Sequence, residues 1–207
     1  MNQQTEQQDL KKKILTTGIR VGTTVKTKFM KPFITQASPE GLYLLDLDIT
    51  LSRIQIAAKF IKKFDINRVI IHSGRTYATT PIEKFCELTG AKKMLGRFMP
   101  GTLTNPLLPY FIEPQLVVIS DPQIDNQAIT EATNAGVPVI GIANTDNVTS
   151  KLDLIIPANN RGRKSLATIY WLLANEILAE NSSKDSKKTK YEIDDFETKT
   201  ADVEEEL

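Results

Sequence analysis

The sequence predicts an α/β protein in which helices cover both faces of a parallel sheet. Short apolar runs, of the length typical of buried strands, alternate along the chain with longer segments whose apolar residues recur every three or four positions. Strands that alternate with helices are joined by right-handed crossovers, which give a doubly wound, three-layer α/β/α fold. The 207 residues suffice for one such domain with a buried core and additional terminal segments.

The expected elements follow one another in a regular order. A continuous apolar run at residues 42–47 predicts a central strand buried on both faces, and Asp48 is expected to cap a helix that reaches about residue 64. Further strands are expected at residues 69–72, 93–95, 116–120, 137–142 and 154–156. Further helices are expected around residues 81–88, 126–135 and 164–179, the first two ended by Gly90 and Gly136.

The two ends of the chain differ in charge, although the net charge is only +1. Residues 1–8 are Gln-rich and expected to be disordered, residues 9–39 to form a short helix and a basic arm (residues 18–39), and residues 40–181 to form the α/β domain. Residues 182–207 hold five Lys and nine Asp or Glu, so they carry −4 and the rest carries +5; we expect a disordered acidic tail. All seven charged residues between Leu10 and Pro39 are positive: Lys11, Lys12, Lys13, Arg20, Lys26, Lys28 and Lys31.

The composition argues against several classes of protein. The chain has no run of about 18 apolar residues and no apolar segment of a signal peptide near its start, so we expect a cytoplasmic protein without a membrane partner. A single Cys precludes an internal disulfide and suits a reducing compartment. One His and one Cys cannot build a Cys/His metal cluster, and we expect neither a metal nor a cofactor.

A stretch in the middle of the chain, GRFMPGTLTNP at residues 96–106, predicts a shaped recognition loop. Its prolines fix φ, Gly101 permits positive φ, and Thr102, Thr104 and Asn105 can form local hydrogen bonds that hold the loop without a core beneath it. Arg97 stands at the start of the loop. A plain connection between two strands is the alternative interpretation.

Four stretches carry a resemblance to a known family. The loop sequence is followed by EPQLVVISDPQIDNQAITEATNAGVPVIGIANTDN (residues 113–147) and preceded by GTTVKTKFMKPFI (residues 22–34) and GLYLLDLDITLSRIQIAAKFI (residues 41–61). Together they resemble the small-subunit ribosomal protein S-two family in its archaeal and eukaryotic branch, over about residues 10–179. The resemblance implies a flavodoxin-like fold without catalytic activity, cofactor or small-molecule substrate. The coiled-coil hairpin that bacterial members insert is absent, which fits that branch.

The resemblance implies a structural constituent of the small ribosomal subunit that binds small-subunit rRNA and neighbouring ribosomal proteins. Lys and Arg bind RNA phosphates and position a protein on RNA without reading base sequence. Positive charge before the last predicted helix opposes the helix macrodipole, which favours a phosphate partner over a solvated basic turn. We expect RNA contacts from three groups: Lys11, Lys12, Lys13, Arg20, Lys26, Lys28 and Lys31 of the N-terminal helix and arm; Arg75 with Arg97, Thr102, Thr104 and Asn105 around the loop; and Arg161, Arg163 and Lys164.

An enzymatic alternative rests on the acidic residues that follow predicted strands. Asp46 and Asp48, in DLDIT, resemble the DxDxT motif of haloacid-dehalogenase-type phosphatases, and Asp121 and Asp125 have the spacing of a Mg²⁺ site. Against a phosphatase, Ile49 replaces the usual glycine, Asp48 suits a helix cap, and no segment is free to form a lid. We therefore keep a Mg²⁺-dependent phosphatase only as the alternative function.

Other possible sites have simpler explanations. No G-x-G-x-x-G follows the first predicted strand, which argues against a dinucleotide site. Residues 73–76 suit either a phosphate bound to backbone N–H groups or a plain turn into a helix. Cys86 is expected to be a buried structural thiol and His72 a hydrogen-bonded residue at a strand end, and Trp171 is expected to pack against the sheet.

Overall fold

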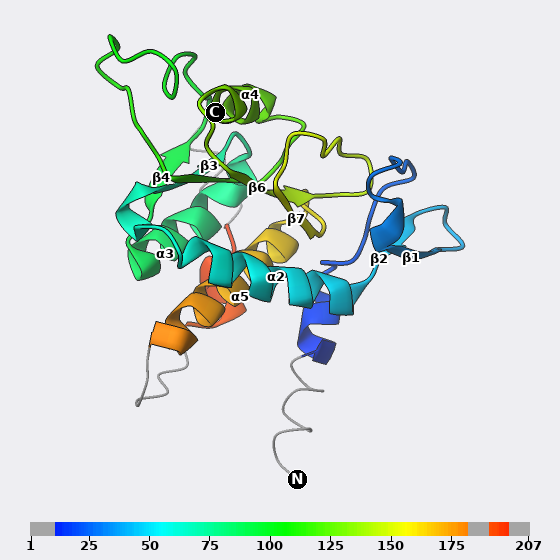
Figure 1. Cartoon of the computed structure of the whole chain (residues 1–207). Coiled ribbons are helices and arrows are strands. Elements are labelled where there is room, and N and C mark those ends of the chain that lie inside the picture. The colour runs from blue at the N-terminus through cyan, green and yellow to red at the C-terminus, as the bar shows by residue number, and fades with distance from the viewer. Residues whose placement is uncertain (1–10, 182–190, 199–207) are drawn as a thin grey trace.

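The computed structural model describes residues 11–181 and 191–198 (Figure 1). Two of its strands form a hairpin beside the domain, and the other five form the central sheet. In chain order the strands and longer helices are β1 (Ile34–Ala37), β2 (Tyr43–Leu45), α2 (Leu47–Ile61), β3 (Val69–Ser73), α3 (Thr79–Thr89), β4 (Lys92–Leu95), β5 (Leu116–Ile119), α4 (Asn126–Asn134), β6 (Val139–Ala143), β7 (Leu154–Pro157) and α5 (Arg163–Asn181).

The central sheet is parallel throughout, with strand order β4-β3-β5-β6-β7. Counted along the chain, these strands have the order 2-1-3-4-5, which is the flavodoxin-like arrangement. All residues of β3, β5 and β6 are buried, as expected for strands covered on both faces. The predicted fold class is therefore confirmed. The carboxyl ends of the five strands meet at one side of the sheet, called here the carboxyl edge.

Helices cover both faces of the sheet, giving three layers. Figure 1 shows α2, α3 and α5 on one face and α4 on the other. Side chains alternate between the two sides along each strand, so Ile71 and Val118 pack with the three helices whereas Ile70 and Val117 pack with α4. None of the helices within residues 11–181 and 191–198 is long and apolar enough to cross a membrane.

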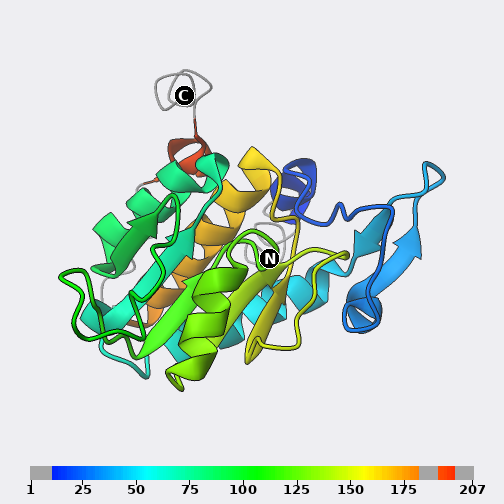
Figure 2. The same cartoon turned by 90° about the horizontal axis from the view of Figure 1, so that it is seen from above.

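The predicted strand at residues 42–47 is wrong in its placement. Residues Tyr43–Leu45 form β2, which pairs antiparallel with β1 in a hairpin apart from the main sheet (Figure 2). Tyr43 is only half-buried, because no helix layer covers the hairpin. The predicted cap is also wrong: the carboxylate of Asp46, not Asp48, accepts hydrogen bonds from the first backbone N–H groups of α2.

The arm packs on the domain. Residues 11–16 are helical, and Ile14 is buried in the core formed by α2, α3 and α5. Beyond this helix the backbone N–H of Gly22 donates to the carbonyl of Tyr43 (2.8 Å), and that of Thr27 donates to the carbonyl of Thr145 (2.9 Å). The arm therefore joins the β1–β2 hairpin to the β6–β7 loop (residues 144–153).

The predicted disordered tail needs correction at residues 191–198. Here a 3₁₀ helix, Ile193–Phe196, packs on α5 and α3, and the Phe196 side chain is completely buried. The two apolar residues of this helix anchor an otherwise acidic segment, a feature that counting charges does not reveal. The predictions of disorder at residues 1–8 and in the rest of the tail fall on 1–10, 182–190 and 199–207, outside the described residues.

Candidate nucleic-acid interface

The sequence-predicted cations that follow strands lie along the carboxyl edge, because parallel strands end at the same side of a sheet. Arg75 comes two residues after β3, Arg97 two after β4, and Arg161 four after β7. The arm reaches the same edge through its contacts with the β6–β7 loop. The structure thus brings much of the predicted site together, and it separates exposed cations from internally paired ones.

Two exposed lysines of the arm lie beside the β6–β7 loop. Lys26 and Lys28 flank Thr27, whose hydroxyl donates to the carbonyl of Asn147 (3.0 Å). Lys26 also lies over the ring of Tyr43, with its Nζ 4.6 Å from the ring centroid. The neighbouring Phe29 is 53 % exposed. An exposed aromatic ring next to exposed lysines is a combination typical of RNA-binding surfaces.

The remaining cations of the N-terminal region differ in their surroundings. Lys12, Lys13 and Lys31 are exposed, and Lys13 lies with Lys164 beside the acidic segment of residues 192–194. Lys11 is paired with Asp48 at 2.7 Å. Arg20 is half-buried, and its Nε has no hydrogen-bond partner among the described residues.

Arg75 is held by a buried carboxylate. Its Nε donates to Oδ2 of Asp121 (2.6 Å), a second guanidinium nitrogen contacts the same oxygen, and Asp121 is completely buried. Next to it, the backbone N–H of Gly74 donates to Oδ1 of Asp125 (2.8 Å). Protein carboxylates therefore occupy the anion-binding geometry considered for residues 73–76, and the plain helix-entry turn is the correct interpretation.

The recognition loop is organised by a residue that sequence reasoning missed. Glu131 of α4 is 5 % exposed, and its carboxylate accepts from the backbone N–H of Gly101 (2.8 Å) and of Leu103 (3.3 Å). Gln127 donates to the same carboxylate (2.8 Å). Glu131 is an acidic residue on the buried side of α4, next to Ala132, and this position is the signal from which its structural role could have been predicted.

The loop also has a core beneath it, contrary to prediction, because Phe98 and Leu103 pack with α4. Thr102 is buried and its hydroxyl donates to the carbonyl of Met99, so it does not fit the prediction of an RNA contact. By contrast, Arg97, Thr104 and Asn105 are exposed. Asn105 accepts the backbone N–H of Leu107, and the Thr104 hydroxyl lies 3.5 Å from Glu131.

The cluster before α5 divides in the same way. Arg161 is exposed and its guanidinium donates to Asp146 (2.5 Å) and Gln123 (3.1 Å) across the carboxyl edge. Arg163 is turned instead toward the 191–198 segment, where it contacts Glu197 and the carbonyl of Thr198. Lys164 is exposed. Arg161 and Lys164 are exposed and can reach a ligand, although Arg161 also has internal partners, whereas Arg163 is half-buried and paired.

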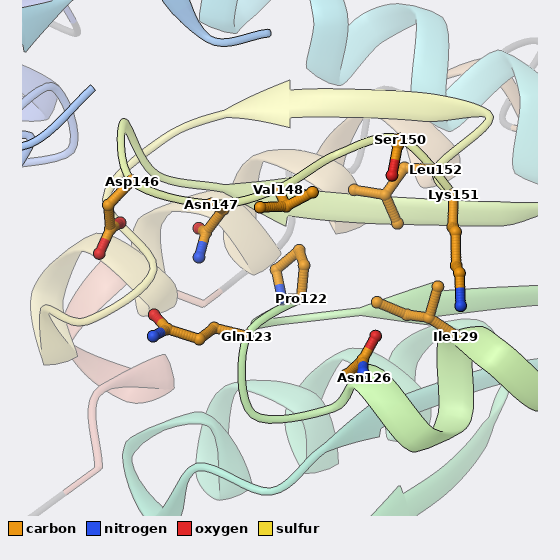
Figure 3. A pocket seen from close by; sticks show the side chains of 10 residues that line it. All are labelled: Pro122, Gln123, Asn126, Ile129, Asp146, Asn147, Val148, Ser150, Lys151 and Leu152. Atoms are coloured by element: carbon orange, nitrogen blue, oxygen red, sulfur yellow. The ribbon is translucent and has the colours of Figure 1, made fainter. Parts of the chain in front are cut away.

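A pocket of about 350 Å³ opens at the carboxyl edge beside the β5–α4 loop (residues 120–125) and runs between α4 and the β6–β7 loop, which returns there toward the start of β7 (Figure 3). Its apolar wall is formed by Pro122, Ile129 and Leu152, and polar side chains of both loops surround the opening. Leu152 can pack in this wall only because residue 141 of β6 is a glycine. A β-carbon on Gly141 would stand 2.5 Å from Cδ1 of Leu152.

The phosphatase constellation is not assembled. Asp46 and Asp48 follow a strand of the hairpin, whereas Asp121 and Asp125 follow β5 of the main sheet. Asp46 caps α2, and Asp48 is exposed and paired with Lys11. Within residues 11–181 and 191–198, no three His, Cys, Asp or Glu side chains lie close enough to hold a metal ion.

Three other residues have structural roles. Cys86 is buried on α3, and this burial raises the pKa of its thiol to about 12, so the thiolate is strongly disfavoured. His72 is bonded through Nδ1 to the carbonyl of Met94 (2.9 Å). Trp171 is half-buried and donates from its indole to the carbonyl of Tyr191 (2.9 Å). The thiol and histidine interpretations are confirmed.

Fold and site together define an α/β protein whose internal carboxylates hold its loops in place and whose exposed cations line one edge. A family model described as Ribosomal protein S2 matches residues 111–180. The chain is 70 % identical over 205 residues to the Small ribosomal subunit protein uS2 of Nitrosopumilus maritimus, covering 99 % of both chains. It is 57 % identical to that of Cenarchaeum symbiosum (95 % of both) and 46 % to that of Saccharolobus solfataricus (80 % of this chain, 72 % of the relative). The chain belongs to the ribosomal protein S2 family.

Proposed function

We propose that this chain is a structural constituent of the small ribosomal subunit, without enzymatic activity, and that it binds small-subunit rRNA along the carboxyl edge. The observation that carries the first part is 70 % identity over nearly the whole length to an archaeal small-subunit protein. The same family membership removes the support for a phosphatase, in line with the separation of Asp46 from Asp121.

The geometry supports some of the predicted RNA contacts over others. Exposed groups at or beside the carboxyl edge can meet phosphates, whereas Thr102 is buried and Arg75 and Arg163 are half-buried and engaged with protein carboxylates. Arg161 is also paired, with Asp146, but its side chain is exposed. The proposed contacts are Lys26, Lys28, Lys31, Arg97, Thr104, Asn105, Arg161 and Lys164. The exposed ring of Phe29 adds a stacking surface next to the two arm lysines.

Exposed apolar residues in and just after the recognition loop offer a contact surface for neighbouring ribosomal proteins. Leu107 is 91 % exposed, and Met99 and Tyr110 are 52 % and 39 % exposed. Large exposed apolar side chains such as these are candidates for contacts with another protein. A Leu107→Asp variant should reduce cross-linking to small-subunit proteins while leaving rRNA affinity unchanged; unchanged cross-linking would remove Leu107 from the proposal.

The RNA contacts are tested by filter binding of purified small-subunit rRNA to two triple variants of equal charge. One variant changes Lys26, Lys28 and Lys31 to Ala; the control changes Lys59, Lys63 and Lys92, which are also exposed but lie at the end of α2 and the start of β4, away from the carboxyl edge. The arm variant should lose at least about tenfold in affinity and lower the slope of log K against log salt by about 2. Equal losses in both variants would contradict the assignment.

A further inference from the structure

The pocket at the carboxyl edge has the features of a binding site for a single nucleotide. Three amide side chains surround it: Gln123 and Asn126 from the β5–α4 loop and the start of α4, and Asn147 from the β6–β7 loop above them (Figure 3). Each amide carries both donors and acceptors, as the edge of a nucleobase does. The apolar wall formed by Pro122, Ile129 and Leu152 offers a surface for a flat ring.

The side-chain amide of Asn147, which lines this pocket, has a buried N–H donor without a partner among the described residues. Asn147 is 1 % exposed, and its Oδ1 accepts from the backbone N–H of Asn144 (2.6 Å) and from Nδ2 of Asn160 (3.0 Å). These two bonds fix the orientation of the amide, because the backbone N–H of Asn144 requires an acceptor. The Nδ2 of Asn147 then has no partner among the described residues, and Figure 3 shows it directed toward the side of the pocket where Gln123 lies.

Two cations stand at opposite ends of the same pocket. Arg161 bonds Asp146 and Gln123 at one end. Lys151 lies at the other end, where its Nζ contacts the hydroxyl of Thr130 (3.0 Å). Figure 3 shows Asp146 and Lys151 on opposite sides of the opening. Cations at both ends of the pocket could pair with the phosphates on either side of a bound nucleotide, as in a continuous RNA strand.

We propose that this pocket receives one nucleotide that is turned out of the bound rRNA, with its base against Ile129 and Leu152, its edge bonded to Asn147, and its flanking phosphates at Arg161 and Lys151. The volume of about 350 Å³ is at the small end of ligand pockets and suits one base. RNA-binding proteins read such unstacked bases through their edges and faces. This inference rests on the proposed rRNA binding.

The arm links the pocket to the main RNA surface. Thr27, between Lys26 and Lys28, donates to the carbonyls of the β6–β7 loop at Thr145 and, through its hydroxyl, at Asn147. Phosphate contacts along the arm therefore hold the loop that presents the Asn147 amide. The pocket and the arm lysines act on neighbouring parts of one RNA segment.

The test is nucleotide-resolution chemical probing of small-subunit rRNA in particles reconstituted with wild type, Ser150→Trp, Asn126→Asp or Asn134→Trp. Ser150 and Asn126 line the pocket and are exposed, so changes there fill it or remove a donor without disturbing the core, whereas Asn134 lies at the far end of α4. With wild type and Asn134→Trp, one unpaired nucleotide should be protected at its base edge. Ser150→Trp should restore its full reactivity, Asn126→Asp should raise it, and Ser150→Trp should weaken rRNA affinity about fivefold or more.

The outcomes separate this inference from the proposed function. Protections that are identical in wild type and Ser150→Trp would overturn the pocket assignment and leave rRNA binding intact; failure of wild type to bind rRNA would overturn both. In a second experiment, the protein is titrated with each nucleoside 5′-monophosphate while the side-chain amide signals of Asn126 and Asn147 are followed by NMR. Weak, unselective shifts agree with a nucleotide held by its RNA strand. Tight saturable binding of one free nucleotide would contradict the RNA source.

Discussion

A β-carbon on Gly22 would stand 2.5 Å from Cγ2 of Thr145 and 2.6 Å from the carbonyl oxygen of Tyr43. The arm can approach the β6–β7 loop only because residue 22 has no side chain. This contact also lets Thr23 bond Thr145 through both its backbone N–H and its hydroxyl, at 2.9 Å each. One glycine thus positions the lysines of the arm beside the carboxyl edge.

Replacing Gly22 should release the arm. Gly22→Ala forces either the arm or the loop to move, and should lower the free energy of unfolding by about 1–3 kcal/mol. Trypsin should then cut more rapidly at Lys26 and Lys28. Gly162→Ala is the matched control, since its nearest contact would be a side-chain atom of Asn159 at 3.2 Å. Equal cleavage rates in the two variants would refute the role of Gly22.

Removing the charge of Glu131 should loosen the recognition loop. In Glu131→Gln one carboxylate oxygen becomes a donor that faces the backbone N–H of Gly101 or Leu103, which should lower the free energy of unfolding by about 1–3 kcal/mol. Hydrogen exchange at those two amides should accelerate. Glu83→Gln, which changes a half-buried acid paired with Lys93, should leave these two amides unaffected. Unchanged exchange in Glu131→Gln would show that another contact holds the loop.

Replacing Arg75 should mainly lower the stability of the protein, whereas replacing Arg97 should mainly weaken its binding to rRNA. Arg75→Ala leaves the buried Asp121 carboxylate unpaired and should lower the free energy of unfolding by about 3 kcal/mol. Arg97→Ala removes an exposed cation, so it should change stability by less than about 0.5 kcal/mol while weakening rRNA binding. Urea unfolding and filter binding of both variants measure the difference. A stable Arg75→Ala protein would contradict the structural role of the pair.

The packing of the 191–198 segment on α5 can be followed by the fluorescence of Trp171. Trp171 is the single tryptophan of the chain and donates its indole N–H to the carbonyl of Tyr191. Phe196→Ala removes a fully buried ring, so the segment should detach and the fluorescence of Trp171 should shift to longer wavelength. Asp194→Ala, a change at an exposed position of the same 3₁₀ helix, should leave the spectrum unchanged. An unaltered spectrum in Phe196→Ala would argue against docking.

The free energy of unfolding should fall in alkaline solution because the Cys86 thiol and the Tyr170 hydroxyl are buried. Burial raises the pKa of Cys86 to about 12 and raises that of Tyr170, whose hydroxyl is bonded to Ser120. A pKa raised on folding stabilises the protein below the unfolded pKa, here 9.0 for the thiol, and this contribution is lost as the pH rises toward the folded value. The urea midpoint should drop between pH 9 and pH 12, and less steeply in Cys86→Ala. Equal pH dependence in both proteins would contradict this assignment.

The sequence predicts the central sheet well because its strands are simple to recognise. β3, β5 and β6 are continuous apolar runs, and Gly90, which ends α3, takes the positive φ of 84° that its glycine permits. The run at residues 42–47 looks the same but forms a hairpin strand. Burial of a run does not reveal which sheet it joins, and the partner strand β1 is largely polar and exposed.

The candidate site was only partly predictable for a related reason. Exposed lysines such as Lys26 and Lys28 can be predicted from the local sequence, because all the charged residues around them are positive and offer no local partner. The internal pairing of Arg75 depends on Asp121, 46 residues away, and the loop depends on Glu131, about 30 residues beyond Gly101. Such pairs are set by the packing of β5 and α4, which no local pattern encodes.

Sedimentation of tagged protein from a native lysate through a sucrose gradient tests the central claim most directly. Wild type should migrate with the small ribosomal subunit at low salt, and the Lys26, Lys28 and Lys31 to Ala variant should dissociate at a lower salt concentration than the Lys59, Lys63 and Lys92 to Ala control. A folded wild-type protein that stays at the top of the gradient at low salt would contradict its assignment to the small subunit.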